Sequence, residues 1–84
     1  MKGLEYYRKK INSLDEFIYI LLEKRAEHAH NISKIKKENN LPIRNGKREQ
    51  EILKRIIDMN ESKYSNSAIR RIFRCIIDET TKTE

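Results

Sequence analysis

Residues 4–38 read LEYYRKKINSLDEFIYILLEKRAEHAHNISKIKKE, and this stretch decides the fold. Its apolar residues recur at spacings of three and four, the period of a helix with one apolar side. They are Leu4, Tyr7, Ile11, Leu14, Ile18, Leu21, Ala29, Ile32 and Ile35. No proline or glycine interrupts the pattern, so we predict one helix over residues 4–38. At ~1.5 Å per residue it would be roughly 50 Å long, more than the rest of so short a chain can cover.

The remainder of the chain predicts two shorter helices and a single domain spanning residues 1–84. Residues 39–46 (NNLPIRNG) predict a loop, because Asn tolerates left-handed backbone and Pro42 disfavours helix at the residue before it. Asn45 can cap a helix over about 47–59, and the polar segment 60–66 precedes a helix over about 67–81. No segment shows the alternation of a strand. The predicted fold class is therefore all-α, with one long and two shorter helices.

Size, charge and cysteine content limit the kinds of protein this can be. A chain of 84 residues buries only about 60–65% of its unfolded surface, which favours oligomerisation. Its net charge of +6 attracts nucleic acid, anionic lipid or small polyanions. The longest apolar run, residues 17–22, is too short to span a bilayer, and the N-terminus lacks an apolar signal region. Cys75 is the only cysteine and cannot form an internal disulfide, so we predict a cytoplasmic protein.

Several charged residues fall on or beside apolar faces, where an unpaired charge is costly. Labelled in heptads, Arg25 lies on the seam of the long helix, and Arg8 and Lys36 lie next to it. Arg25 could equally form an interface ion pair or extend its head to water, and the other two could lie on a solvated face. Arg48 stands at a helix N-terminus against the macrodipole preference, which indicates a nearby anion. Glu49 points toward the core side, as the partner of one of these cations or as part of a cap. Together the cations suit a compact ligand with two carboxylates.

The sequence contains no pattern typical of covalent, metal or nucleotide chemistry. His28 falls on the seam and is interpreted as a packed histidine, and His30 as a surface residue. No second His or Cys stands at metal-ligand spacing, and Cys75 has no visible base partner. Glycine-rich phosphate loops and nucleophile elbows are missing. We therefore predict no metal and no cofactor.

The ordered set of these residues resembles a known family. Its elements are Arg8-x-x-Ile11-x-x-Leu14-Asp15, then Leu21-Leu22-x-x-Arg25, then Lys36, then Pro42-Ile43-x-x-x-x-Arg48-Glu49, and finally Ile72-Phe73-x-x-Ile76-Ile77. This order is similar to that of the all-α class of chorismate mutases and covers about residues 4–84. The resemblance implies an intertwined homodimer in which two long first helices pair. It also implies the rearrangement of chorismate to prephenate, which needs no nucleophile, metal or proton transfer.

The resemblance assigns roles to the cations. Arg8 matches the arginine that each subunit donates to its partner's site. Arg25 matches the arginine that binds a substrate carboxylate within the subunit. Lys36 matches the lysine that contacts a carboxylate and the ether oxygen, and we expect it to be the main electrostatic contributor. Arg48 matches a further cation near the site, and we count it with Lys36 among the catalytic residues.

The remaining matched positions are polar or acidic. Glu49 matches the carboxylate that binds the ring hydroxyl, and Thr80 a Ser or Thr near a substrate carboxylate. Asn45 stands where relatives often have Asp, and a backbone contact there would survive the change. Glu84 stands where many bacterial members have Gln and fungal enzymes have Glu. As a catalytic residue Glu84 must be protonated to donate to the ether oxygen, so we expect higher activity at acidic pH and a flatter pH profile in Glu84→Gln.

Three other functions remain open at the level of the sequence. An isochorismate-pyruvate lyase shares the architecture and a similar cation set. A small basic helical module that binds nucleic acid would use the four tyrosines and show steeply salt-dependent affinity. A helical dimerisation module would carry no chemistry at all. We favour the mutase, acting as a stand-alone enzyme on a small-molecule substrate, with neither nucleic acid nor membrane as a partner.

Overall fold

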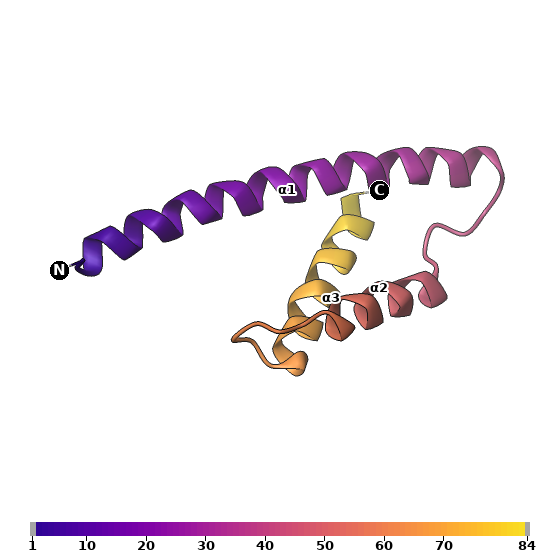
Figure 1. Cartoon of the computed structure of the whole chain (residues 1–84). Helices are drawn as coiled ribbons and strands as arrows, with labels where there is room; N and C mark the ends of the chain where they lie inside the picture. The colour runs from indigo at the N-terminus through magenta and orange to yellow at the C-terminus, as the bar shows by residue number, and fades with distance from the viewer. Residues whose placement is uncertain (1, 84) are drawn as a thin grey trace.

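The computed structural model describes residues 2–83, which form three helices and, within that range, no strand. They are α1 (Leu4–Glu38), α2 (Gly46–Asp58) and α3 (Asn66–Thr83), shown in Figure 1. The bounds of α1 agree with the predicted residues 4–38, while those of α2 and α3 differ from prediction by one or two residues. The all-α fold class predicted from the helical spacing is confirmed.

The end of α1 shows why the long helix stops where it does. Asn39 caps the helix, and Asn40 adopts left-handed backbone with φ 57°. The Leu41 N–H then donates to the Lys36 carbonyl at 2.8 Å, and the Asn40 N–H donates to that of Lys37 at 3.3 Å. These two bonds satisfy carbonyls that the ending helix would otherwise leave without partners. The Asn-Asn pair before Leu-Pro thus forms the turn that its sequence predicts.

Side-chain caps begin the other two helices. The Asn45 side chain accepts from the Arg48 N–H at 3.1 Å at the start of α2. The Ser65 hydroxyl accepts from the Ala68 N–H at 3.1 Å at the start of α3. Each side-chain oxygen satisfies one of the free N–H groups of a helix N-terminus. The loop before α2 and the turn before α3 are therefore both held in defined positions.

Helix α3 runs between the other two helices and packs against both of them (Figure 1). The small core lies there: Leu53 of α2 is 2% exposed and Ile77 of α3 is 5% exposed. The N-terminal half of α1 extends beyond this core with no other helix beside it (Figure 1). The molecule is accordingly elongated, with principal extents of 59 × 24 × 17 Å.

The apolar stripe of α1 is uncovered in the single chain. We define this stripe as the apolar residues at helical spacing along its N-terminal half, each 54–65% exposed: Leu4, Tyr7, Ile11, Leu14, Ile18 and Leu21. A contiguous apolar surface of this length is typical of an interaction site rather than of a monomer's surface. Among the described residues, no helix is long and apolar enough to cross a membrane.

Candidate active site

A cavity of about 250 Å³ lies where the C-terminal half of α1 faces α2, α3 and the loop between α1 and α2. Six of the eight residues predicted for the site line it: Arg25, Lys36, Asn45, Arg48, Glu49 and Thr80. On α1, Arg25, Ala29, Ile32 and Lys36 reach the same cavity because spacings of four and three place them on one side of a helix. The fold thus gathers residues far apart in the chain around one small space.

A hydrogen bond between Arg25 of α1 and Thr80 of α3 joins the two helices at the cavity. The Arg25 Nη1 donates to the Thr80 Oγ1 at 3.2 Å, and that hydroxyl donates in turn to the Ile76 carbonyl at 2.6 Å. Both side chains are half-buried. The Thr80 hydroxyl therefore has its proton engaged within α3 and offers its oxygen to the guanidinium. The remaining N–H groups of Arg25 can bind an anion bidentately.

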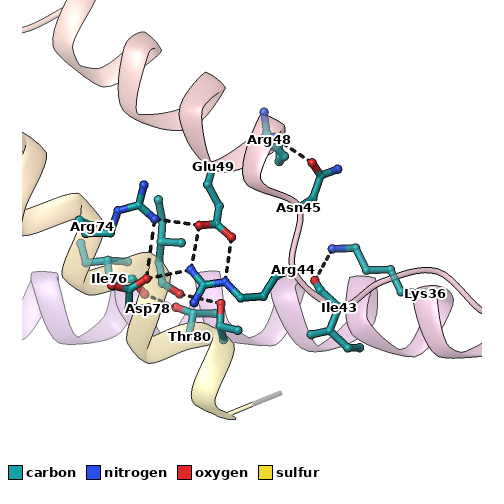
Figure 2. A network of polar contacts seen from close by, with 12 residues as sticks. Lys36, Ile43, Arg44, Asn45, Arg48, Glu49, Arg74, Ile76, Asp78 and Thr80 are labelled. Atoms are coloured by element: carbon teal, nitrogen blue, oxygen red, sulfur yellow. Dashed lines mark hydrogen bonds and ion pairs between the residues drawn. The ribbon is translucent and has the colours of Figure 1, made fainter.

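Lys36 crosses from α1 to the connecting loop. Its Nζ donates to the Ile43 carbonyl at 2.8 Å, and the side chain is half-buried (Figure 2). An ammonium group has three donors, so two remain for a ligand. The bond to Ile43 limits the motion of a flexible side chain. The cation is therefore held at the cavity before any ligand arrives.

Asn45 and Arg48 lie at the start of α2. Asn45 uses its Oδ1 to cap the helix, which leaves its amide N–H₂ as a donor toward the cavity. The Arg48 side chain is exposed, and its nearest acidic partner, a Glu51 oxygen, is 3.8 Å away. An exposed ion pair at this distance holds the arginine only weakly. Among the described residues, no other acidic side chain forms an ion pair with Arg48, so its positive charge is available to a ligand.

Glu49 is the most tightly held acidic group of the site, and its partners differ from those expected. Arg44 donates from Nε to Oε2 at 3.1 Å and from Nη2 to Oε1 at 2.8 Å, and Arg74 Nη1 donates to Oε1 at 2.8 Å (Figure 2). The prediction that Glu49 pairs with one of the cations on or beside the seam, or forms part of a cap, is wrong, because Asn45 caps α2 and Glu49 binds Arg44 and Arg74. The Glu49 side chain is 13% exposed. The hydrogen bond from Arg44, helped by Arg74, lowers the pKa of Glu49 below its ordinary value and outweighs the cost of burial.

Asp78 completes this group on α3. Arg44 Nη2 also donates to Asp78 Oδ1 at 2.9 Å, and Arg74 Nη1 lies 3.7 Å from the same oxygen. These hydrogen bonds to Glu49 and Asp78 raise the pKa of Arg44, so it stays charged. The loop, α2 and α3 are thereby joined by one network of charges. We call Arg44, Glu49, Arg74 and Asp78 the Glu49 network.

Arg8 does not lie at the cavity of its own chain. It is 17 positions before Arg25 on the same helix, about 25 Å away at 1.5 Å per residue. Its side chain is 61% exposed and pairs with Glu5 at 3.0 Å. The predicted role of Arg8 in the site of a partner subunit stays a prediction, since the structure describes a single chain. Glu84 lies outside the described residues.

Sequence reasoning missed Arg44, Arg74 and Asp78, and it misjudged His28. Spacing alone could have indicated the pair on α3, because Arg74 and Asp78 are four residues apart and so lie one turn from each other on the same helix. His28 is exposed and lines the cavity, so its prediction as a packed histidine is wrong for the single chain. Cys75 is a free, exposed cysteine. Within residues 2–83, no three His, Cys, Asp or Glu residues are placed to hold a metal ion.

Comparisons with known proteins agree on one family. The family model for chorismate mutase type II matches residues 7–84. A bifunctional chorismate mutase/prephenate dehydratase of Aquifex aeolicus is 38% identical over 88 residues, which cover 100% of this chain and 24% of that protein. Its Escherichia coli K12 counterpart is 33% identical over 78 residues, which cover 92% of this chain and 20% of that protein. The chain thus spans about a quarter or less of the curated relatives it matches.

Solved structures extend the likeness to the whole fold. Chorismate mutase from Thermus thermophilus (form II) superposes with a TM-score of 0.92 and 26% identity, covering 93% of this chain and 89% of that one. Form I of the same protein gives a TM-score of 0.89, and the superposition covers 90% of this chain and 95% of that one. The helical order, the cavity between the helices and the matched residues lead to the same conclusion: the chain belongs to the chorismate mutase type II family.

Proposed function

We propose that this chain rearranges chorismate to prephenate, on the route to phenylalanine and tyrosine. The observation that carries the proposal is the cavity in which Arg25, Lys36 and Arg48 surround one small space beside Glu49. At about 250 Å³ the cavity is small for a ligand pocket, and it suits a compact metabolite with two carboxylates. Family membership supports the same substrate.

The reaction is one concerted step in which a C–O bond breaks while a C–C bond forms. No proton, nucleophile or cofactor takes part, so the protein must hold the reactive conformer and stabilise its changing charge. Negative charge grows on the ether oxygen as the C–O bond lengthens. The two free donors of Lys36 fit this task, because one can bind a carboxylate while the other meets the ether oxygen.

The other residues of the cavity orient the substrate. Arg25 binds a carboxylate with the N–H groups that its bond to Thr80 leaves free. Arg48 adds a third cation to Arg25 and Lys36, and Asn45 can offer its amide N–H₂. Glu49, held ionised, accepts from the ring hydroxyl. Catalysis by Glu84 in its protonated form stays a prediction, as does a cytoplasmic location.

We also propose that the working form is an intertwined homodimer to which each subunit donates Arg8. The apolar stripe of α1 supports it, because within residues 2–83 nothing covers that surface. Two such helices packed together would bury the stripe and carry Arg8 to the site of the second copy. The exposure of Arg8, about 25 Å from its own cavity, fits this role.

The experiment is to follow the loss of chorismate absorbance with purified protein and to identify the product. Formation of prephenate supports the mutase, and release of pyruvate from isochorismate in a parallel assay would favour the lyase instead. A titration with DNA and RNA across salt concentrations tests nucleic-acid binding. That function does not explain why Arg25 and Lys36 are half-buried in a cavity, since cations that contact phosphates lie exposed. Protein that leaves chorismate unchanged at all concentrations would refute the proposal.

A further inference from the structure

The Glu49 network contains charges that the reaction itself does not use. Arg44 and Arg74 come from the loop and from α3, and both donate to the one carboxylate of α2. Figure 2 shows Arg44 between Glu49 and Asp78, with Arg74 on the other side of the Glu49 carboxylate. With Asp78 the network holds two arginines and two carboxylates, so its charges balance. Among the described residues, however, both arginines donate hydrogen bonds to Glu49, while Asp78 accepts one from Arg44 alone. Charge balance therefore does not explain why the hydrogen bonds converge on Glu49.

The bonds to Glu49 leave its two oxygens in different states. A carboxylate has about four acceptor positions, two on each oxygen. Oε1 accepts from both Arg44 Nη2 and Arg74 Nη1, at 2.8 Å each, so both of its positions are filled. Oε2 accepts only from Arg44 Nε, at 3.1 Å, among the residues that the structure describes. One acceptor position is therefore left on Oε2, and Glu49 lines the cavity.

We infer that Arg44 and Arg74 are positioning residues that lock Glu49 as a single directed acceptor, with Oε2 aimed to receive the hydroxyl of the ligand. Asp78 in turn fixes Arg44 by accepting from Nη2 at 2.9 Å. The identity of the ligand in this inference rests on the proposed function. The orientation of the Glu49 carboxylate rests on the hydrogen-bond geometry alone. It assigns the selection of a hydroxyl-bearing ligand to residues that never touch that ligand.

Charge and geometry make separate contributions in this network. The two guanidinium groups keep Glu49 ionised, which makes it an acceptor and never a donor. The fork of Arg44 fixes the plane of the carboxylate, because its two parallel bonds permit one orientation. The other charged or titratable groups facing this cavity are Arg25, His28 and Lys36 from α1 and Arg48 from α2. The positive charges of Arg25, Lys36 and Arg48 have the sign that favours an ionised carboxylate at Glu49.

The test measures the ionisation of Glu49 directly, by ¹³C NMR of its carboxyl carbon across pH in the free protein. The signal is assigned by its loss in Glu49→Gln. We expect wild-type Glu49 to titrate below 4.5, and Arg74→Gln to move its pKa upward toward that value. Arg71→Gln is the matched control, because Arg71 is an exposed arginine of α3 that bonds only to Ser67 among the described residues. Wild-type Glu49 that titrates at or above its ordinary value of 4.5, or a pKa that Arg74→Gln leaves unchanged, would overturn the inference.

Kinetics at neutral pH then test the positioning role. Arg74→Gln should raise KM for chorismate roughly tenfold, as expected for a lost bond to a charged group, while adding little in a Glu49→Gln background. Effects that simply add in the double variant would overturn the role, because independent residues add. Arg44→Lys keeps the charge but gives up the fork, so it should raise KM while the pKa of Glu49 stays low. An unchanged KM in Arg44→Lys would also contradict the inference.

Two further outcomes keep this inference distinct from the proposed function. If the wild type does not convert chorismate but the NMR titrations behave as expected, the substrate is wrong and the locked acceptor stands. If the wild type converts chorismate and Glu49 titrates normally, the function stands and the network is structural only. Circular dichroism shows whether each variant folds. Should Arg74→Gln fail to fold, Arg74→Lys and Arg44→Lys, which keep the charge, should raise KM while Glu49 still titrates below 4.5. An unchanged KM in both lysine variants would then overturn the inference.

Discussion

The Lys36 ammonium donates to the Ile43 carbonyl at 2.8 Å and so ties the last turn of α1 to the loop that leads into α2. Two residues separated by a helix end and a left-handed turn are brought together by that turn, in which Asn40 has φ 57°. The cation that we propose for catalysis is thus positioned by a backbone group, which substitution of the Ile43 side chain cannot remove.

Replacing Lys36 should be the most damaging single change to the chemistry. We expect Lys36→Ala to lower kcat by about 10²–10³, the usual cost of losing a donor to a developing oxyanion. Lys34→Ala is the matched control, because Lys34 is an exposed lysine of the same helix that does not line the cavity. Initial rates of chorismate loss measure both. Equal rates for the two variants would remove Lys36 from the mechanism.

Mixing two inactive variants should restore activity if Arg8 acts in the partner's site. Arg8→Ala and Lys36→Ala each damage both sites of their own homodimers. A mixed dimer has one site with neither change and one site with both. Random reassortment makes half of the dimers mixed, so about a quarter of wild-type activity is expected in a two-fold assembly. Activity is measured after unfolding and refolding the variants together. A mixture no more active than its components would place Arg8 elsewhere.

Thr80→Val should weaken substrate binding more than it slows the chemistry. The change removes the oxygen that accepts from Arg25 at 3.2 Å and leaves the guanidinium free to rotate. Loss of one hydrogen bond to a charged group predicts a rise in KM of about tenfold. Thr83→Val is the control, because Thr83 makes a similar backbone bond, to the Thr80 carbonyl at 2.7 Å, without lining the cavity. A fall in kcat at constant KM would contradict this account.

The Glu49 network should make stability depend on pH in the acid range. Because folding lowers the pKa of Glu49, its ionised form stabilises the fold above the ordinary value of 4.5. That stability is lost as pH falls through the lowered pKa. We expect Glu49→Gln to destabilise the protein at pH 7 and to approach wild type at pH 3, measured by urea unfolding at one fixed protein concentration.

The matched control for this pH dependence is Glu51→Gln. Glu51 is an exposed glutamate two residues later, and it pairs only loosely, at 3.8 Å, with Arg48. Its replacement should change the free energy of unfolding little at either pH, as is usual for exposed ion pairs. If both variants lose the same stability at pH 7, the network adds nothing to the fold.

The helices could be predicted because local chemistry determines them. The spacing of apolar residues predicts the full length of α1. Asn39 and Asn40 set the end of that helix, and Asn45 sets the start of α2. Arg25 and Lys36 could be placed near a site because a charge beside an apolar seam needs a partner or a ligand. These inferences use neighbours within a few turns of one helix.

The partners of Glu49 could not be predicted, because they depend on how α3 crosses α2. Arg44 lies in a loop, where no period indicates direction, and Arg74 lies 25 residues from its partner. Nor does the seam pattern say whether a residue faces another helix of its own chain. The position of Arg8, about 25 Å from Arg25 along α1, therefore does not by itself show in which subunit's site it acts.

The uncovered stripe of α1 also has a consequence for kinetics. If a second chain must supply the missing packing surface, the encounter of two chains becomes part of folding rather than a later event. Burying side chains such as Leu4 and Ile18 then contributes stability only after that encounter. Recovery of helical signal after dilution from denaturant should therefore follow second-order kinetics, with a half-time that shortens as the concentration of chains rises.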